Sequence, residues 1–233
     1  MGLKDKVAVI TGAGRGIGEA IAVAYAKEGA KVVCAARSKN EIDRVAREVG
    51  GLAVECDVAK ETDAKNLIDT ALEAYGRIDI LVNNAGAIAR ELTHELAVEE
   101  WDAVMDVSLR GTFLCTKCAL PSMLERKEGI IINVSSLAGI RGVTRRSAYT
   151  ASKHGVNGFT KVLAVEYLSK GIRPHVICPG PTASRMRSES FPNEDPETIV
   201  QAEDIADAAL FLALQKRTAY TQEMVVNPPG LAI

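Results

Sequence analysis

Short runs of apolar residues alternate along the chain with longer segments in which apolar residues recur at helical spacing. The short runs are rich in β-branched residues and favour strands, whereas the longer segments favour amphipathic helices. We expect strands at Val7–Ile10, Lys31–Ala35, Leu52–Val54, Ile78–Val82, Ile130–Val134, His175–Cys178 and Met224–Val226. We expect helices at Gly16–Lys27, Glu41–Val49, Thr62–Tyr75, Glu99–Leu124, Tyr149–Leu168 and Asp204–Leu214.

The predicted strands are apolar throughout, without the alternation typical of a half-exposed sheet. Strands of this kind belong to a parallel sheet that helices cover on both faces. Right-handed crossovers then produce a doubly wound α/β fold of the Rossmann type, with about seven strands and with ligands at their carboxyl ends. We expect one such domain over residues 1–233, in which the polar segment 184–200 forms a mobile loop beside the substrate.

Composition and charge narrow the range of partners. Of 233 residues, 47% are hydrophobic and 25% are charged, which is ordinary for a globular protein. The formal net charge of −2 gives no reason to expect nucleic acid or an anionic membrane as a partner. No apolar run approaches the ~20 residues that a membrane helix needs, and the N-terminus shows no signal-peptide pattern. We therefore expect a cytoplasmic protein.

The five cysteines are scattered through apolar segments. Cys115 and Cys118 form a C-x-x-C pair, a spacing found in redox and metal sites. They lie inside a predicted helix, however, and no second pair of cysteines or histidines supplies the remaining ligands of a zinc site. We expect buried free thiols, in keeping with a reducing compartment, and no metal centre.

A glycine-rich segment follows the first predicted strand and opens directly into a helix. It reads TGAGRGIG over residues 11–18, with the spacing T-G-x-x-x-G-x-G. Glycines let the backbone approach a pyrophosphate, whose charge the amides of a helix N-terminus can bind. The candidate cofactor-binding residues here are Gly12, Gly14, Arg15, Gly16, Ile17 and Gly18.

The end of the second predicted strand bears on the choice between NAD(H) and NADP(H). A site selective for NAD places an acidic residue there to bind the ribose hydroxyls. This chain has Ala36 followed by Arg37, and Arg15 lies in the glycine loop. Two guanidinium groups without a carboxylate suit a 2′-phosphate, so the sequence favours NADP(H), with NAD(H) as the alternative.

A tyrosine and a lysine stand four residues apart, at Tyr149 and Lys153, with Ser136 thirteen positions before the tyrosine. Residues at i and i+4 share one face of a helix, so the ammonium can lie beside the phenol. A free tyrosine has a pKa of about 10, and a nearby positive charge should lower it toward the working range. A serine hydroxyl from another element could hold a carbonyl oxygen beside the same phenol.

The glycine loop and the Ser136, Tyr149 and Lys153 set are the two parts of a nucleotide-dependent site. With both present, the chain resembles the short-chain dehydrogenase/reductase family from about Lys4 to Val226. It is similar to the bacterial 3-oxoacyl-carrier-protein reductases and related ketoreductases of that family. The motifs that carry the resemblance are the glycine loop, Asn83-Asn84-Ala85-Gly86, Asn133-Val134-Ser135-Ser136 and Tyr149 with Lys153. The resemblance implies catalytic roles for Ser136, Tyr149 and Lys153. It also implies cofactor contacts for Asp57, Val58, Asn84, Ala85, Gly86, Pro179, Gly180, Thr182 and Ser184, and for Tyr149 and Lys153 themselves.

The chain departs from the family pattern in three places. The family usually has an asparagine seven residues after a tryptophan, where it holds a water that relays protons toward the lysine; here Trp101 leads to Ser108. Ser108 is shorter, so the relay must shift or take in another water. Pro174-His175 replaces the usual Val-Asn before the sixth strand, where proline is tolerable at the first position. The C-terminal segment also differs, although family members often form tetramers and we expect a homo-oligomer, a dimer or a tetramer.

The resemblance implies hydride transfer between a nicotinamide and a small-molecule ketone or secondary alcohol. We expect a ketoreductase in which Tyr149 protonates the carbonyl oxygen, Ser136 hydrogen-bonds it, and Lys153 binds the nicotinamide ribose. The alternatives are an alcohol, polyol or sugar dehydrogenase that works oxidatively, and a non-catalytic NADPH-binding protein. Arginines before Tyr149 and at the start of the 184–200 segment could attract an acidic substrate, or they could form a solvated face.

Overall fold

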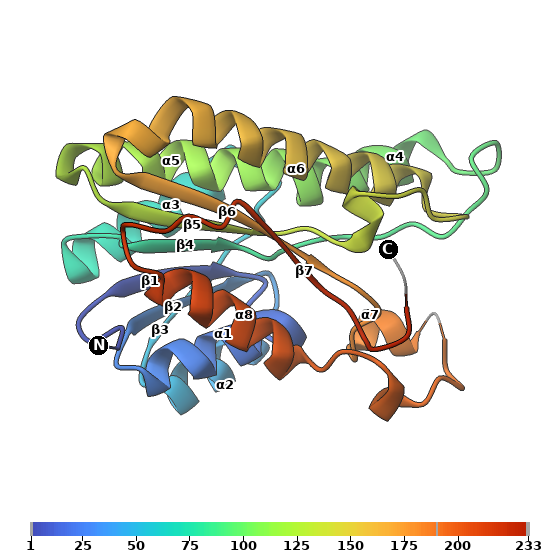
Figure 1. The fold of residues 1–233 in the computed structure, drawn as a ribbon, viewed down its shortest axis with the longest axis horizontal. Helices are drawn as coiled ribbons and strands as arrows, with labels where there is room; N and C mark the ends of the chain where they lie inside the picture. The colour runs from blue at the N-terminus through green and yellow to red at the C-terminus, as the bar shows by residue number, and fades with distance from the viewer. Residues whose placement is uncertain (1, 190, 232–233) are drawn as a thin grey trace.

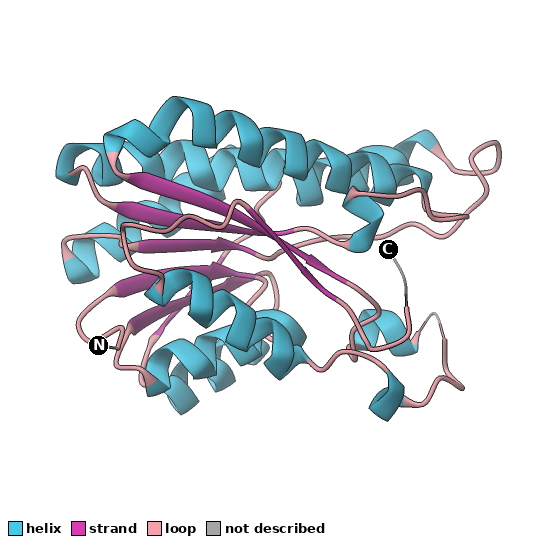
Figure 2. Cartoon of the chain, viewed as in Figure 1, coloured by secondary structure: helices cyan, strands magenta, loops and turns pink. Residues whose placement is uncertain are grey.

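A computed structural model of the chain describes residues 2–189 and 191–231, and it contains a parallel sheet in the order β3-β2-β1-β4-β5-β6-β7. All the strands run in the same direction, so their carboxyl ends lie at one end of the sheet (Figure 2). Their bounds are β1 Val7–Thr11, β2 Lys31–Ala36, β3 Leu52–Glu55, β4 Ile80–Asn83, β5 Gly129–Val134, β6 Ile172–Pro179 and β7 Glu223–Val226. The predicted doubly wound α/β fold is confirmed.

Helices cover both faces of the sheet (Figure 1). One layer consists of α1 Gly16–Lys27, α2 Lys39–Val49 and α8 Ala202–Leu214. The other consists of α3 Glu61–Tyr75, α4 Val98–Met105, α5 Gly111–Arg126 and α6 Ser147–Tyr167. The strand order reverses between β1 and β4, and a reversal of this kind opens a crevice at the carboxyl ends of the two strands.

Each face of the sheet carries its own core, which explains why the strands are apolar throughout. Successive side chains of a strand point to opposite faces. Ala8 and Ile10 accordingly pack in the core under α1 and α8, whereas Val9 between them packs in the core under α3 and α5. All three side chains are fully buried.

The long helix predicted over residues 99–124 is interrupted. It consists of α4, a π-helical turn at Asp106–Arg110, and α5. A π-helical turn holds one residue more than an α-helical turn and is frequent at functional sites. Ser108 lies in this turn and is completely buried.

Strand β6 begins earlier than predicted, so Pro174 is its third residue and not its first. The next amide on the same edge of the strand, that of Val176, donates to Gln222 on the β7 side. The backbone nitrogen of Pro174 therefore also points toward the β7 side of the strand. β7 pairs with β6 only from Val176 onward, so no strand lies beside Pro174 to accept a hydrogen bond from it. No ladder hydrogen bond is lost, and the proline is tolerated inside the strand.

The segment 184–200 was expected to be a mobile loop, but it contains local structure. It includes α7 Arg185–Ser188 and a 3-10 turn at Pro196–Thr198, and Arg187 Nε donates to Glu194 Oε2 at 2.6 Å. A single bridge between Thr182 and Val200 closes its base. Ser190, within this segment, lies outside the described residues. Helix α7 lies beyond the carboxyl ends of the strands (Figure 1).

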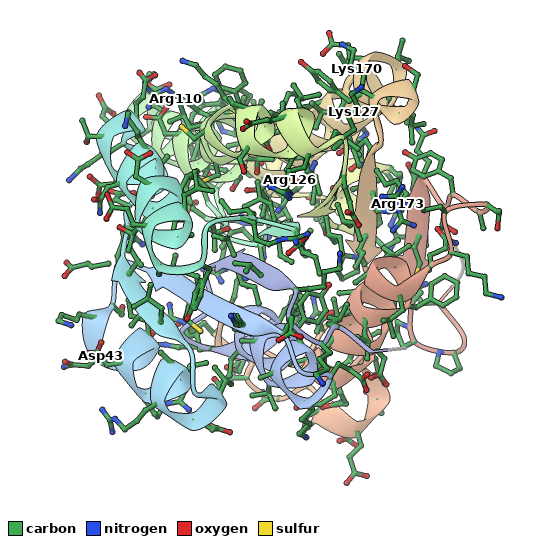
Figure 3. All side chains as sticks on the ribbon, turned by 90° about the vertical axis from the view of Figure 1, so that its left-hand side faces the viewer. Asp43, Arg110, Arg126, Lys127, Lys170 and Arg173 are labelled. Atoms are coloured by element: carbon green, nitrogen blue, oxygen red, sulfur yellow. The ribbon has the colours of Figure 1, made fainter. Side chains whose placement is uncertain are left out.

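The buried carboxylate of Asp79 lies at the opposite end of the sheet, before β4, where it pairs with Lys6, Arg77 and Arg126. Figure 3 shows this end, with Arg126, Lys127, Lys170 and Arg173 labelled. Asp79 accepts the backbone N–H of Val7 at 2.9 Å and also pairs with Arg77. The carboxylate thus ties the start of β1 to the start of β4.

None of the described helices is long and apolar enough to cross a lipid bilayer. All five cysteines are free, and four of them are buried. Over the described residues, no group of three or more His, Cys, Asp or Glu side chains is arranged to hold a metal ion.

Candidate active site

A cleft of about 580 Å³ lies at the crevice where the strand order reverses. It extends from the ends of β1 and β2, past the end of β4, to α6 and α7. The predicted residues that line it are Gly12, Gly14, Arg15, Gly16, Ile17, Arg37, Asp57, Val58, Asn84, Ala85, Gly86, Tyr149, Lys153 and Ser184. The structure therefore brings both halves of the predicted site to one continuous cleft.

The glycine loop has little room for side chains. A Cβ on Gly12 would lie 2.8 Å from the amide nitrogen of Asn84, and a Cβ on Gly18 would lie 2.2 Å from the carbonyl oxygen of Gly12. Asn84 holds the loop in place, because its Nδ2 donates to the carbonyls of Thr11 and Gly12 at 3.0 and 3.1 Å. The backbone can therefore approach a ligand closely where α1 begins. These features fit the pyrophosphate of a dinucleotide.

The far end of the cleft departs from the prediction. We expected two arginines and no carboxylate, but Glu41 of α2 also lines the cleft and pairs with Arg15 at 3.0 Å. Sequence reasoning missed Glu41 because it lies well beyond the end of β2, the position at which an acidic residue was sought. Arg37 also lines the cleft, and it contacts no acidic side chain among the residues that the structure describes.

Tyr149 and Lys153 line the other end of the cleft, and Ser136, which is not among the lining residues, contacts Tyr149. The Ser136 hydroxyl is hydrogen-bonded to the Tyr149 phenol, and its oxygen also accepts the backbone N–H of Ala138 at 3.1 Å. The Lys153 ammonium lies 5.7 Å from the centre of the Tyr149 ring and donates to the carbonyl of Val134 at 2.8 Å. The serine, the phenol and the ammonium predicted from the sequence are therefore neighbours.

The charge balance at Tyr149 differs from the expectation that Lys153 lowers its pKa. Burial raises the pKa of Tyr149, and the groups that oppose this are the Ser136 hydroxyl and the Arg146 guanidinium. Lys153 is itself buried, which lowers its own pKa to about 8. The net direction is upward for the phenol because the loss of hydration outweighs the nearby charge.

Neighbouring polar groups fix the relative positions of Ser136 and Lys153. The Ser135 hydroxyl donates to the backbone carbonyl of Lys153 at 3.2 Å, and Asn157 Nδ2 donates to the carbonyl of Gly139 at 3.2 Å. These bonds attach the turn after β5 to α6. The Ser135 hydroxyl is thus engaged in holding the turn and the helix together.

A buried amide ladder stands beneath this end of the cleft. Asn83 of β4 donates to Asn133 of β5 at 2.9 Å and to Thr116 of α5 at 3.0 Å. Asn133 in turn donates to Thr160 of α6 at 2.9 Å. The ladder connects the two central strands to α5, which follows the π-helical turn of Ser108, and to α6, which carries Tyr149. The two asparagines are register partners, so the register of β4 on β5 makes the ladder.

Ser108 is held by the backbone that follows the end of β4. Its hydroxyl accepts the N–H of Ala87 at 3.0 Å and donates to the carbonyl of Ala87 at 3.3 Å. The hydroxyl proton is thus already engaged by protein. Its second lone pair leaves room for one more donor.

Not every residue predicted to contact the cofactor lines the cleft. Ser184 does, and its hydroxyl also caps α7. Thr182 is buried, and its hydroxyl donates to the carbonyl of Gly180 at 2.9 Å. Gly180 packs on Asn227, since a Cβ there would lie 2.1 Å from the asparagine Oδ1. Gly18, Pro179, Gly180 and Thr182 are not among the residues that line the cleft.

Residues 6–195 match the family described as short chain dehydrogenase. The chain belongs to the short-chain dehydrogenase family. It is therefore an oxidoreductase that acts on CH–OH or C=O groups with a nicotinamide cofactor, as the resemblance implied.

Named relatives of this short-chain dehydrogenase differ in activity. The chain is 40% identical to the 3-oxoacyl-[acyl-carrier-protein] reductase of Synechocystis sp., over 98% of this chain and 97% of the relative. A solved 3-ketoacyl-(acyl-carrier-protein) reductase from Brucella melitensis, complexed with NADH, is 34% identical with a TM-score of 0.89, covering 97% of this chain and 98% of that one. A structure described as ribose-5-phosphate isomerase from Brucella melitensis 16M is 35% identical with a TM-score of 0.91, covering 96% and 91%. A shared fold thus leaves the substrate open.

Several residues of this dehydrogenase site escaped the sequence prediction. Besides Glu41, the cleft is lined by Ala36, Ser38, Cys56, Ile88, Arg90, Val107, Val134, Ser135, Met186 and Glu189. Arg185 also lines it, and the sequence had offered this arginine either as a contact for an acidic substrate or as part of a solvated face. Most of the missed residues come from loops whose path depends on tertiary packing. Arg90, for example, reaches across the cleft mouth and donates to the backbone carbonyl of Met186 at 2.8 Å. No pattern in the sequence pointed to that contact.

Proposed function

We propose that this chain is an NADP(H)-dependent ketoreductase that converts a small-molecule ketone to a secondary alcohol. The observation that carries the proposal is the hydrogen-bonded pair of Ser136 and Tyr149 at the end of the nucleotide cleft, with Lys153 beside it. Burial raises the pKa of Tyr149, so the phenol is protonated at neutral pH. A protonated phenol is the form that a carbonyl reduction needs.

In the proposed reaction the bound reduced nicotinamide supplies the hydride. The Tyr149 hydroxyl donates its proton to the carbonyl oxygen, and the Ser136 hydroxyl donates a hydrogen bond to the same oxygen. One preorganised donor of this kind typically contributes about 3 kcal/mol to transition-state stabilisation. Lys153 lines the cleft and is held near the phenol by its hydrogen bond to the carbonyl of Val134.

Arg37 supports a preference for NADP(H). It lines the cleft at the carboxyl end of β2 and is free to pair with a 2′-phosphate. Arg15 supports it less, because Glu41 already neutralises its charge. A comparison of kcat/KM for NADPH and NADH tests this part of the proposal, and a preference for NADH would contradict it.

The catalytic assignment is tested with Y149F in a screen of NADPH consumption over β-ketoacyl thioesters, β-ketoesters, diketones and sugar ketones. We expect Y149F to lose turnover while NADPH binding, followed by fluorescence, is nearly unchanged. Y167F is a matched control, because Tyr167 lies at the end of the same helix and away from the cleft. Near-normal turnover by Y149F would refute the assignment.

A further inference from the structure

Helix α7 connects the two sides of the nucleotide crevice. Its N-terminal cap, Ser184, lies against the glycine loop, since a Cβ on Gly16 would be 3.9 Å from the Ser184 Cβ. Two residues further on, the backbone carbonyl of Met186 accepts a hydrogen bond from Arg90, which comes from the segment after β4. All four residues line the cleft. The helix thus joins the segments that follow β1 and β4, the two strands between which the crevice opens.

The Arg90 guanidinium makes the contact on the β4 side. Its Nη2 donates to the Met186 carbonyl at 2.8 Å, and the Glu189 carboxylate lies 4.0 Å from the same nitrogen. A hydrogen bond from a guanidinium is charge-assisted and stronger than one between neutral groups. The Arg90 side chain is 34% exposed, so water weakens the contact only in part.

The backbone that carries Arg90 is itself fixed. Arg145, in the loop before α6, donates from Nε to the carbonyl of Arg90 at 3.1 Å and pairs through Nη2 with Glu91 at 3.1 Å. Helix α6 carries Tyr149 and Lys153. The contacts therefore form a chain that runs from the loop before α6, through the segment after β4, to α7.

The segment that contains α7 has internal contacts that do not depend on Arg90. Arg185 pairs with Glu189 at 3.0 Å, one helical turn later. Arg187 Nε donates to Glu194 Oε2 at 2.6 Å. Both pairs lie within the segment and do not involve the segment after β4. Loss of the Arg90 bond should therefore release α7 from the β4 side and leave its local structure in place.

We propose that Arg90 is a positioning residue that tethers α7 across the cleft and thereby sets the rates at which the nicotinamide nucleotide enters and leaves. The tether joins two parts of the protein and includes no group of the nucleotide. Breaking it should raise the fraction of molecules with an open mouth, which serves entry and release alike. The association and dissociation rate constants should rise together, and their ratio, Kd, should change little.

The chain carries its own probe for these rates. Trp101 is its only tryptophan and packs on the same small apolar cluster as Tyr149. Stopped-flow mixing with NADPH gives the association rate constant from the quenching of Trp101 fluorescence. Displacement of bound NADPH by excess NADP⁺ gives the dissociation rate constant.

The variant R90M keeps the length of the side chain and removes every donor. We expect it to raise both rate constants about five- to twentyfold, near the lower end for a hydrogen bond to a charged group, with less than about a threefold change in Kd. R90K can donate to the same carbonyl and should restore part of the wild-type behaviour. NADH should show the same factors as NADPH, because the tether does not involve the 2′-phosphate.

R173M is the matched control. Arg173 also donates from its guanidinium to a carbonyl of another segment, that of Gln215 at 2.6 Å, but it lies near the start of β6 and does not line the cleft. R173M should leave both rate constants unchanged. R145Q removes the bond that fixes the Arg90 backbone, so it should raise both rate constants by a smaller factor, and it should add little to R90M in the double variant. If R90M does not fold, R145Q decides.

A rise in the dissociation rate constant alone, with a matching rise in Kd, would show that Arg90 contacts the nucleotide directly and would overturn the tether. Rate constants at wild-type values in R90M, or in R145Q where R90M does not fold, would overturn it as well. The inference uses the nicotinamide cofactor of the family and the experiment contains no ketone. Its failure therefore leaves the ketoreductase proposal standing, and inactivity in the ketone screen leaves the tether standing.

Discussion

Replacing Ser108 with alanine removes the side chain that holds the backbone of Ala87 at the wall of the cleft. The substitution leaves both the N–H and the C=O of Ala87 without that partner. An unsatisfied backbone group costs about 1–3 kcal/mol, and the half-buried position of Ala87 places each near the lower value, about 2 kcal/mol in total. The higher helix propensity of alanine stabilises the folded chain by about 0.5 kcal/mol and offsets part of this loss. The net loss in the free energy of unfolding is about 1.5 kcal/mol.

For a chain of this length a loss of about 1.5 kcal/mol corresponds to a fall in Tm of roughly 3–6 °C, measurable by calorimetry. NADPH affinity should fall as well, because Gly86 and Ile88 on either side of Ala87 line the cleft. S169A is the control: it makes the same change at an exposed serine in the 3-10 turn that follows α6, and it should stay within about 0.5 kcal/mol of wild type. If S108A has the same Tm as the wild type, Ser108 does not stabilise the backbone of Ala87 at the wall of the cleft.

Three further predictions concern pH, cofactor choice and assembly. Burial lowers the pKa of His175 to about 4 from 6.5, so the unfolded chain binds the extra proton between these values and stability falls as pH drops below 6.5. In urea titrations below pH 6.5, the free energy of unfolding of H175Q should fall less steeply than that of the wild type, by up to about 1.4 kcal/mol per pH unit. Equal acid sensitivity of the two proteins would contradict the prediction. E41Q frees Arg15 and should raise the NADPH-to-NADH ratio of kcat/KM about two- to fivefold; a lower ratio would count against a 2′-phosphate site. Val165, Val162 and Phe113 form an exposed apolar face on α5 and α6, where Val165 is 87% exposed, so V165K should reduce the assembly mass in light scattering if this face joins subunits. An unchanged mass would exclude the face.

The sequence was sufficient for features that depend on local pattern. Val9 between Ala8 and Ile10 is apolar because both faces of β1 are covered, and such strands are readable without a structure. The glycine loop and the spacing of Tyr149 and Lys153 follow from backbone geometry over a few residues. These are the features on which the prediction and the structure agree most closely.

Other features depend on segments far apart in the chain, so the sequence could not supply them. Glu41 meets Arg15 because α1 and α2 pack together at the end of the sheet, and no spacing rule places a carboxylate there. The burial that governs Tyr149 also comes from packing, which is why the predicted direction of its pKa was wrong.

The π-helical turn at Asp106–Arg110 changes how variants of this chain should be designed. One residue of an α-helix accounts for about 100° of rotation, so the extra residue sets the helix before the turn out of phase with α5. A substitution within the turn changes a side chain and leaves that rotation in place. Deleting a single residue there would turn the face of α4 that now packs on α6, together with Trp101, about 100° away from it. Insertions and deletions near Ser108 are therefore a more severe class of change than point mutations.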